Sequence, residues 1–190
     1  MIKNLIRKNR TYRRFYQEIK IERNVLEELI DLARLSSSGA NLQSLKYILS
    51  YEQEKNDMIF PHLNWAGYLA DWNGPEEGEK PSAYIIMLGD KDISKNYFWD
   101  HGIACQSILL GACEKGFGGC MFGSIDRENL KKSLNIPENY ELLLVIALGK
   151  PKETVVLEEL KDDGNIKYWR DEKGVHHVPK RKLKDVILEL

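Results

Sequence analysis

The segment from residue 100 to residue 123, DHGIACQSILLGACEKGFGGCMFG, restricts the possible folds of this chain more than any other segment. Between Ile103 and Cys113, Gln106 and Ser107 are almost the only polar residues. A helix that is apolar nearly all round must be buried, and this one is too short and too interrupted to span a membrane. We therefore expect a central helix, covered on all sides, that ends at Gly116 as a left-handed cap residue.

Three glycines follow this helix within a few apolar residues, at positions 118, 119 and 123. Glycine weakens a strand, so such a cluster predicts a backbone that something approaches closely. One alternative is a flat ligand, toward which backbone amides would direct their dipoles. The other is close packing of the strand against a helix, and the glycines alone favour neither.

Apolar patterns elsewhere predict the elements around this centre. The continuous apolar runs 83–88 and 142–148 are typical of strands buried on both faces. Amphipathic spacing predicts a helix over 22–35, and Asp126 is a suitable cap for a helix over 127–134. We also expect a short helix at 1–6, a strand over 46–52, a partly helical segment over 57–69 around Trp65–Tyr68, and a loop over 73–81. The pattern indicates one α+β domain over residues 1–190, a sandwich with a sheet covered on both faces.

Charge and cysteine content limit the class of protein. The net charge is −1, but basic residues gather before residue 15 and again over 180–184. Two basic ends in a nearly neutral chain suggest a local anion site rather than a nucleic-acid track. The three cysteines lie in the apolar centre without a C-x-x-C pair, which predicts free buried thiols and neither disulfides nor zinc. Residues 1–8 have no signal-peptide core, so we expect a cytoplasmic protein.

Three polar motifs are candidates for ligand binding. Arg10, Thr11 and Arg13 could converge as a phosphate cradle, although a solvated basic surface is favoured from local sequence alone. The small and amide residues Ser38-Gly39-Ala40-Asn41-Leu42-Gln43 suit the edge of a heterocycle, or form only a helix-to-strand turn. Lys180 and Arg181 could clamp a second side of a phosphate, or belong to a solvated tail.

Other chemistries lack their motifs. The sequence has neither a G-x-G-x-x-G after the first strand nor a P-loop. It has no G-x-S-x-G elbow. The four histidines, at 62, 101, 176 and 177, show no metal-binding spacing. In an extended segment His176 and His177 would point to opposite sides.

Taken in order, these motifs resemble the FMN-dependent nitroreductase family, in its short members of about this length. Residues 10–15, RTYRRF, are similar to the family's R-S-x-R-x-F, and residues 38–43, SGANLQ, to its S-x-x-N-x-Q. Residues 116–123, GFGGCMFG, are similar to G-L-G-x-C-x-x-G, and Pro179-Lys180-Arg181 resembles the family's C-terminal motif. The chain departs from the family where Ser37 replaces a proline, where Ser44-Leu45 replaces Pro-Trp, and where Cys120-Met121-Phe122 replaces a tryptophan-containing run.

The resemblance implies an intertwined homodimer with a central mixed sheet flanked by helices and two FMN sites at the subunit interface. It assigns the FMN phosphate and ribityl chain to Arg10, Thr11 and Arg13, with Lys180 and Arg181 on the other side of the phosphate. It assigns the ring edge to a turn contributed by the partner subunit, and the ring face to Phe122, Gly123 and a backbone amide directed at N5. The residues of that turn are Ser38, Gly39, Asn41 and Gln43.

The implied activity is that of an NAD(P)H oxidoreductase. A hydride would pass to flavin N5 and then to a nitroaromatic, quinone, free flavin or enone acceptor in a ping-pong cycle. Because the cofactor carries the chemistry, we expect no catalytic acid or base and no metal. A flavin-binding or corrinoid-handling protein without turnover, and a basic-tailed interaction domain without a cofactor, are the alternatives. The acidic loop 75–81 is expected to be a solvated surface loop rather than a lid.

Overall fold

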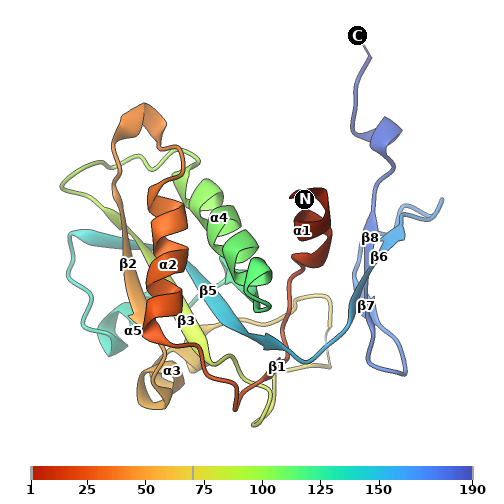
Figure 1. Ribbon diagram of the computed structural model, residues 1–190, viewed down its shortest axis with the longest axis horizontal. Helices are drawn as coiled ribbons and strands as arrows, with labels where there is room; N and C mark the ends of the chain where they lie inside the picture. Colours follow the sequence, from red (N-terminus) through yellow and green to blue (C-terminus); the bar gives the residue numbers. More distant parts are fainter. Residues whose placement is uncertain (1, 70, 190) are drawn as a thin grey trace.

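The computed structural model describes residues 2–69 and 71–189. The two apolar runs are neighbouring antiparallel strands, β3 (Ala83–Asp90) and β5 (Tyr140–Pro151), at the centre of the main sheet. Figure 1 shows this sheet with helices on both sides. Within the described ranges it has five strands, the others being β1 (Phe15–Tyr16), β2 (Leu45–Ser50) and β4 (Gly118–Phe122).

The strand order is β1-β5-β3-β2, and β4 also pairs with β5. These strand pairs are antiparallel. A parallel bridge between Thr11 and Gly119 makes the pairing mixed. β5 is much longer than the run 142–148 predicted, and its last residues pair with β1 and β4. The end of β5 therefore gathers the N-terminal basic loop and the glycine strand at one place.

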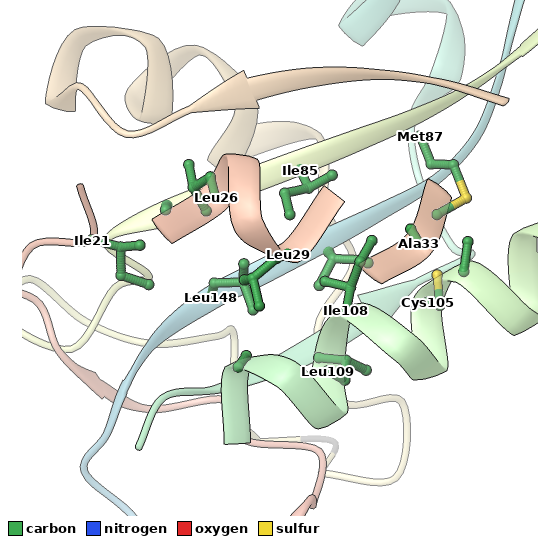
Figure 2. Packing of buried hydrophobic residues seen from close by; sticks show 14 residues of the cluster. Ile21, Leu26, Leu29, Ala33, Ile85, Met87, Cys105, Ile108, Leu109 and Leu148 are labelled. Carbon is green, nitrogen blue, oxygen red and sulfur yellow. The ribbon is translucent and has the colours of Figure 1, made fainter. Parts of the chain in front are cut away.

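Alternate residues of β3 enter two different cores. Ala83, Ile85 and Met87 face α2 (Arg23–Arg34) and α4 (Asp100–Glu114), which lie side by side over one face of the sheet (Figures 1 and 2). Tyr84 and Ile86 face the opposite side, which α3 (Gln53–Ile59) and α5 (Arg127–Ser133) cover. The side-chain period of two in a strand thus explains why β3 reads as an unbroken apolar run. The predicted sandwich, covered on both faces, is confirmed.

The helix α4 is less enclosed than its composition predicted. Ala104, Cys105 and Ile108 are buried against α2 and the sheet, but Ile103 is 37% exposed and Gln106 lies at the surface. One side of this nearly all-apolar helix is therefore uncovered within a single chain. Gly116 has a φ of +79°, as its predicted role of left-handed cap requires.

Two segments differ from the sequence-based expectation. The helix predicted around Trp65–Tyr68 is wrong: α3 begins at Gln53, the 3-10 turn η2 (Phe60–His62) follows it, and Gly67–Tyr68 form a turn. Ala66 has a φ of +34°, a left-handed conformation that a helix excludes. The polar end of the chain forms a second sheet, three-stranded within the described residues, of β6 (Val155–Glu159), β7 (Trp169–Arg170) and β8 (His176–Lys180).

The two ends of the chain lie outside the cores. α1 (Ile2–Lys8) contacts the last turns of α4 but contains no buried residue. After β8 comes the 3-10 turn η3 (Leu183–Asp185), and the chain then extends away from the body (Figure 1). Over the described residues, no helix combines the length and the apolar character that crossing a membrane requires.

Candidate functional site

The basic loop lies directly on the glycine strand. The backbone amide of Tyr12 donates to the carbonyl of Gly119 over 3.0 Å, and Thr11 forms a parallel bridge with the same glycine. Two motifs more than a hundred residues apart in sequence are thereby held side by side. The hydroxyl-bearing residue Thr11 is exposed at this junction.

Arg13 is buried, with 8% of its surface exposed, yet its guanidinium group has no carboxylate partner among the described residues. Its Nη1 lies 3.3 Å from Nε2 of His176, and the group stacks 4.7 Å from the ring centroid of Tyr168. The neighbouring Arg10 donates from Nη2 to the carbonyl of Ile6 over 2.5 Å. Its Nε is buried and has no partner within the described part of the chain. Arg10 and Arg13 therefore carry positive charge that no side-chain carboxylate of the described residues neutralises.

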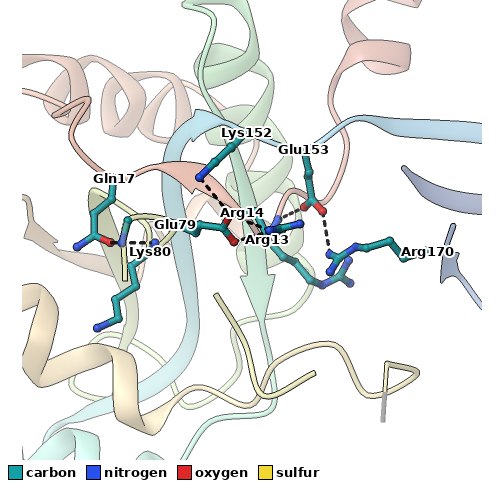
Figure 3. Close-up of polar contacts among 9 residues, drawn as sticks. Arg13, Arg14, Gln17, Glu79, Lys80, Lys152, Glu153 and Arg170 are labelled. Carbon is teal, nitrogen blue, oxygen red and sulfur yellow. Dashed lines mark hydrogen bonds and ion pairs between the residues drawn. The ribbon is translucent and has the colours of Figure 1, made fainter. Parts of the chain in front are cut away.

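Glu153 lies beside Arg13 but does not neutralise its guanidinium group. One of its carboxylate oxygens accepts from the backbone amide of Arg13 over 2.5 Å, and the other pairs with Arg170 at 3.0 Å (Figure 3). The carboxylate thus contacts the main chain of Arg13 and not its guanidinium group. Arg170 in turn lies 4.8 Å from the ring centroid of Trp72, which ties β7 to the body of the protein.

The acidic loop over residues 75–81 is solvated only in part, because residues 76–78 are exposed whereas Glu79 anchors the loop to the protein. Glu79 is buried and accepts two hydrogen bonds from Arg14, at 2.5 and 2.7 Å (Figure 3). Its carboxylate also forms an ion pair with Lys152, whose Nζ lies 3.1 Å from Oε1. The hydrogen bonds from Arg14 and the nearby positive charges hold the pKa of Glu79 below its ordinary value, although burial opposes this. The backbone carbonyl of Glu79 also accepts from the amide of Phe15, which fixes the loop beside β1.

The adjacent histidines on β8 point to opposite sides, as their extended backbone predicted. His176 faces Arg13 and Tyr168, and burial together with the nearby arginines lowers its pKa to about 4. His177 contacts Glu158 and Asp171 and stacks on Trp169 at 4.1 Å between centroids. Burial of His177 favours the neutral ring, but hydrogen bonds to the two carboxylates outweigh it and raise the pKa.

Internal packing accounts for two of the clustered glycines. A Cβ at Gly118 would lie 2.4 Å from the ring of Tyr12, and one at Gly119 would lie 2.5 Å from the carbonyl oxygen of Ala147. These are close approaches of protein to protein, so the packing alternative explains them. Gly123 is different, because its nearest neighbour would be 3.9 Å away.

The side chain of Phe122 points into a core. It is buried and packs edge-on against Trp65, with 4.6 Å between ring centroids. Only the backbone of Phe122 is therefore available to a ligand. Met121 is 47% exposed. The thiol of Cys120 is not a nucleophile at neutral pH, because burial raises its pKa to about 12.

The turn at Ser38–Gln43 is held on the first residue of α4. The buried carboxylate of Asp100 accepts from the Ser38 hydroxyl over 2.6 Å and from the Gly39 amide over 2.8 Å. The backbone amide of Gln43 donates to the Ser38 hydroxyl over 2.9 Å. Ala40, Asn41 and Gln43 all have positive φ, between 48° and 55°. Such backbone strain persists only where surrounding contacts enforce it. The turn borders a cavity of about 300 Å³ between α2, β2 and α4.

A single chain keeps this turn away from the basic loop. The turn is bound at the N-terminal end of α4, whereas Cys113 in its last turn contacts the carbonyl of Leu5, just before the basic loop. The helix has 15 residues, so the two ends are roughly 22 Å apart at 1.5 Å per residue. No hydrogen bond in the described ranges joins the turn to the other motifs.

The C-terminal basic residues are only partly brought to the loop. Lys180 and Arg181 are exposed at the end of β8, four and five residues beyond His176. The carbonyl of Lys180 accepts from Leu160, while its side chain has no ion pair among the described residues. The neighbouring Lys182 is paired with Glu159 at 3.4 Å. The contact between β8 and Arg13 is therefore made by His176 and not by Lys180 or Arg181.

Sequence reasoning missed Asp100, Glu153 and His176. Asp100 is the first residue of α4, where an acidic residue is a common feature and gives no sign of its bond to Ser38. Glu153 and His176 lie in short polar strands without a recognisable period. Because His176 and Arg13 are far apart in the sequence, no local pattern predicts their contact.

Comparisons with known proteins identify the family. The profile of the Nitroreductase family matches residues 6–150. A protein of Archaeoglobus fulgidus, provisionally named NADH dehydrogenase/NAD(P)H nitroreductase, is 28% identical over 160 residues, covering 80% of this chain and 87% of its own. An iodotyrosine deiodinase of Thermotoga neapolitana is 25% identical over 194 residues, covering 90% and 95%.

A solved structure confirms the fold. The NADPH:FMN oxidoreductase of Vibrio harveyi, complexed with NAD+, superposes with a TM-score of 0.65 at 21% identity, covering 84% of this chain and 73% of that one. The sheet with helices on both faces and the basic loop on the glycine strand fall within the region that the family profile matches. On these grounds the chain belongs to the nitroreductase family of oxidoreductases.

Proposed function

We propose that this protein binds FMN and transfers electrons from NADH or NADPH to a small organic acceptor. The observation that carries the proposal is the buried guanidinium group of Arg13, which lies against His176 and Tyr168 without a carboxylate partner among the described residues. A buried cation that lacks a counter-charge is costly, and an anionic ligand relieves the cost. A family in which flavin and nicotinamide chemistry is common makes FMN the preferred ligand.

The donor set of the basic loop fits a phosphate-bearing cofactor. Arg10 has a buried Nε without a partner in the described residues, and Thr11 offers an exposed hydroxyl next to it. Guanidinium groups and hydroxyls are suited to bind phosphate oxygens. Arg10, Thr11 and Arg13 would hold the phosphate and the ribityl chain, and Lys180 and Arg181 would approach from the C-terminal side.

Residues at the other end of α4 suit the ring edge. Asn41 and Gln43 offer both donors and acceptors on a turn that Asp100 holds in a strained conformation. The backbone around Gly123 is open, as a ring lying against it requires. When bound, FMN would accept a hydride at N5 and pass two electrons to the acceptor, so the protein needs only to bind, orient and stabilise charge.

We further propose that the site is completed by a second copy of this chain. The turn and the basic loop are roughly a helix length apart in one chain, which is too far for both to bind one ring and its phosphate tail. Large apolar side chains are exposed on these elements: Ile103 on α4, Ile2 and Ile6 on α1, and Leu183, Val186, Ile187 and Leu188 near the C-terminus. An antiparallel arrangement of two copies of α4 would bring the turn of each to the basic loop of the other.

A purified protein tests the central proposal. We expect it to bind FMN and to show the flavin absorption bands, and NADH or NADPH should bleach these bands under anaerobic conditions. A nitroaromatic, a quinone and an iodinated phenol should then be compared as acceptors, because the relatives include a nitroreductase and a deiodinase. A protein that fails to bind added FMN refutes the proposal, and one that binds FMN but is not bleached favours the flavin- or corrinoid-handling alternative without turnover.

Arg10→Ala tests the phosphate cradle. Loss of one charge-assisted hydrogen bond should weaken FMN binding about tenfold or more. The matched control is Arg7→Ala, which removes an exposed cation from the same segment. Equal affinities in the two variants would remove Arg10 from the site.

A further inference from the structure

His176 is the residue through which the C-terminal sheet reaches the basic loop. Only 1% of its surface is exposed, and its Nε2 lies 3.3 Å from Nη1 of Arg13. Tyr168 packs against both partners: its ring centroid is 5.2 Å from that of His176 and 4.7 Å from the Arg13 guanidinium carbon. The buried His176 and Arg13 and the half-buried Tyr168 form one stack between β8 and the basic loop.

The chemistry of the two groups fixes the direction of their hydrogen bond. An arginine side chain has five donors and no acceptor. Nε2 of His176 must therefore be the acceptor, and the ring hydrogen must be on Nδ1. That Nδ1 is buried and has no partner in the described residues. The low pKa of His176, about 4, agrees with a neutral ring at pH 7.

The neutral ring of His176 can orient the Arg13 guanidinium group without cancelling its positive charge. A carboxylate in the same place would orient Arg13 equally well, but it would also cancel the charge that an anionic ligand needs. The carboxylate of Glu153 binds the main-chain amide of Arg13 and is paired with Arg170. The guanidinium group is thus held by a neutral acceptor and an aromatic face, and no carboxylate of the described residues pairs with it.

From this geometry we propose that His176 is a positioning residue, which as the Nδ1–H tautomer orients Arg13 toward the anionic cofactor without neutralising it. The inference rests on the proposed FMN function. It adds a residue that neither the basic loop nor the C-terminal cations include. His176 itself touches no reacting atom in this arrangement.

Three variants separate orientation from packing. In His176→Gln the amide oxygen can occupy the position of Nε2 and accept from Arg13. The shorter His176→Asn cannot reach that position, and His176→Leu fills the space without an acceptor. We expect FMN affinity within about threefold of wild type for the first variant and about tenfold weaker or more for the other two, as for loss of a hydrogen bond to a charged group. His177→Gln, on the opposite side of the strand, is the matched control.

Affinity is measured by FMN fluorescence during titration of the full-length protein, and thermal denaturation without FMN confirms that each variant is folded. The tautomer is measured independently by nitrogen chemical shifts of the histidine ring at pH 7, which needs no cofactor. An Nε2–H tautomer, or equal FMN affinity in wild type and His176→Leu, overturns the inference while leaving the proposed function in place. A wild-type protein that binds no FMN overturns both.

Discussion

Replacing Gly119 by alanine should destabilise the protein by overpacking rather than by altering a ligand contact. The new Cβ would lie 2.5 Å from the Ala147 carbonyl oxygen, 2.8 Å from Leu109 and 2.9 Å from Leu148. The leucine side chains can shift, but the carbonyl belongs to β5 in the centre of the sheet and cannot move without disturbing its pairing. Gly119 has no positive φ, so alanine itself suits the backbone.

The magnitude follows from two opposing terms. Inserting a methyl group into a well-packed core costs about 1–3 kcal/mol, and contact with backbone places this site in the upper part of that range. Restricting the unfolded chain returns roughly 0.4–1 kcal/mol. We therefore expect a net loss of about 2 kcal/mol in the free energy of unfolding, which lowers the thermal midpoint by about 4–8 °C for a chain of this size.

The assay is urea or thermal denaturation followed by circular dichroism, with equal protein concentrations for all variants. Gly123→Ala is the matched control, because a Cβ there would have its nearest neighbour 3.9 Å away. This variant should keep wild-type stability within about 0.5 kcal/mol while weakening FMN binding. Equal stability of the Gly119 and Gly123 variants would refute the division of the glycines into packing and ligand-facing positions.

Three further perturbations test the polar contacts. Glu79→Gln should lower the free energy of unfolding by about 1–3 kcal/mol, since Arg14 loses its anionic partner, whereas the exposed Glu76→Gln should not; urea denaturation at pH 7 measures both. The low pKa of His176, about 4 against an ordinary 6.5, means that the unfolded chain binds a proton in a range where the folded chain does not. The contribution of this group to the free energy of unfolding is therefore complete above pH 6.5 and falls by at most about 3 kcal/mol as the pH drops to 4. The difference in the free energy of unfolding between wild type and His176→Gln, measured from pH 4 to 7, isolates this contribution. A difference that does not depend on pH would contradict the assignment. Asp100→Asn should destabilise the turn at Ser38 by about 1–3 kcal/mol and weaken FMN binding, as thermal denaturation and flavin titration would show; unchanged values for both would exclude a role in holding the turn.

The parts of the fold that the sequence predicted are those with strong local patterns. A few neighbouring residues are enough to predict these elements: the apolar runs indicate the buried strands β3 and β5, the amphipathic spacing indicates α2, and Asp126 indicates a helix cap. Asp126 accepts from the amide of Asn129, as a helix cap should. Periodicity and capping depend on local geometry, so no distant contact was needed to predict these elements.

The second sheet could not be predicted in this way. β7 has two residues, and β8 contains Pro179, which cannot donate to a neighbouring strand. The proline is tolerated because β7 pairs only with His176 and His177, so β8 has a single neighbour at that point. Such strands form because of tertiary contacts, including the Arg170–Glu153 pair, that a local pattern does not contain.

The contacts around the candidate site could not be predicted from the sequence. The basic loop and the glycine strand, which the resemblance assigned to one ligand, lie side by side, but Phe122 is turned into a core and Glu79 is buried in an ion pair. Both outcomes depend on partners, Trp65 and Arg14, whose contacts join segments about sixty residues apart. Composition correctly marked the acidic loop as polar and could not indicate that one of its carboxylates has two cationic neighbours.

The length of α4 between the turn and the basic loop also has a genetic consequence. If two copies of the chain share each site, a defect at Asp100 and a defect at Arg10 damage different halves of it. A mixed assembly of one chain of each kind then contains one doubly damaged site and one site built entirely from intact halves. Two inactive alleles expressed together would restore part of the activity that neither supplies alone, and a protein whose sites were each built within one chain would show no such complementation.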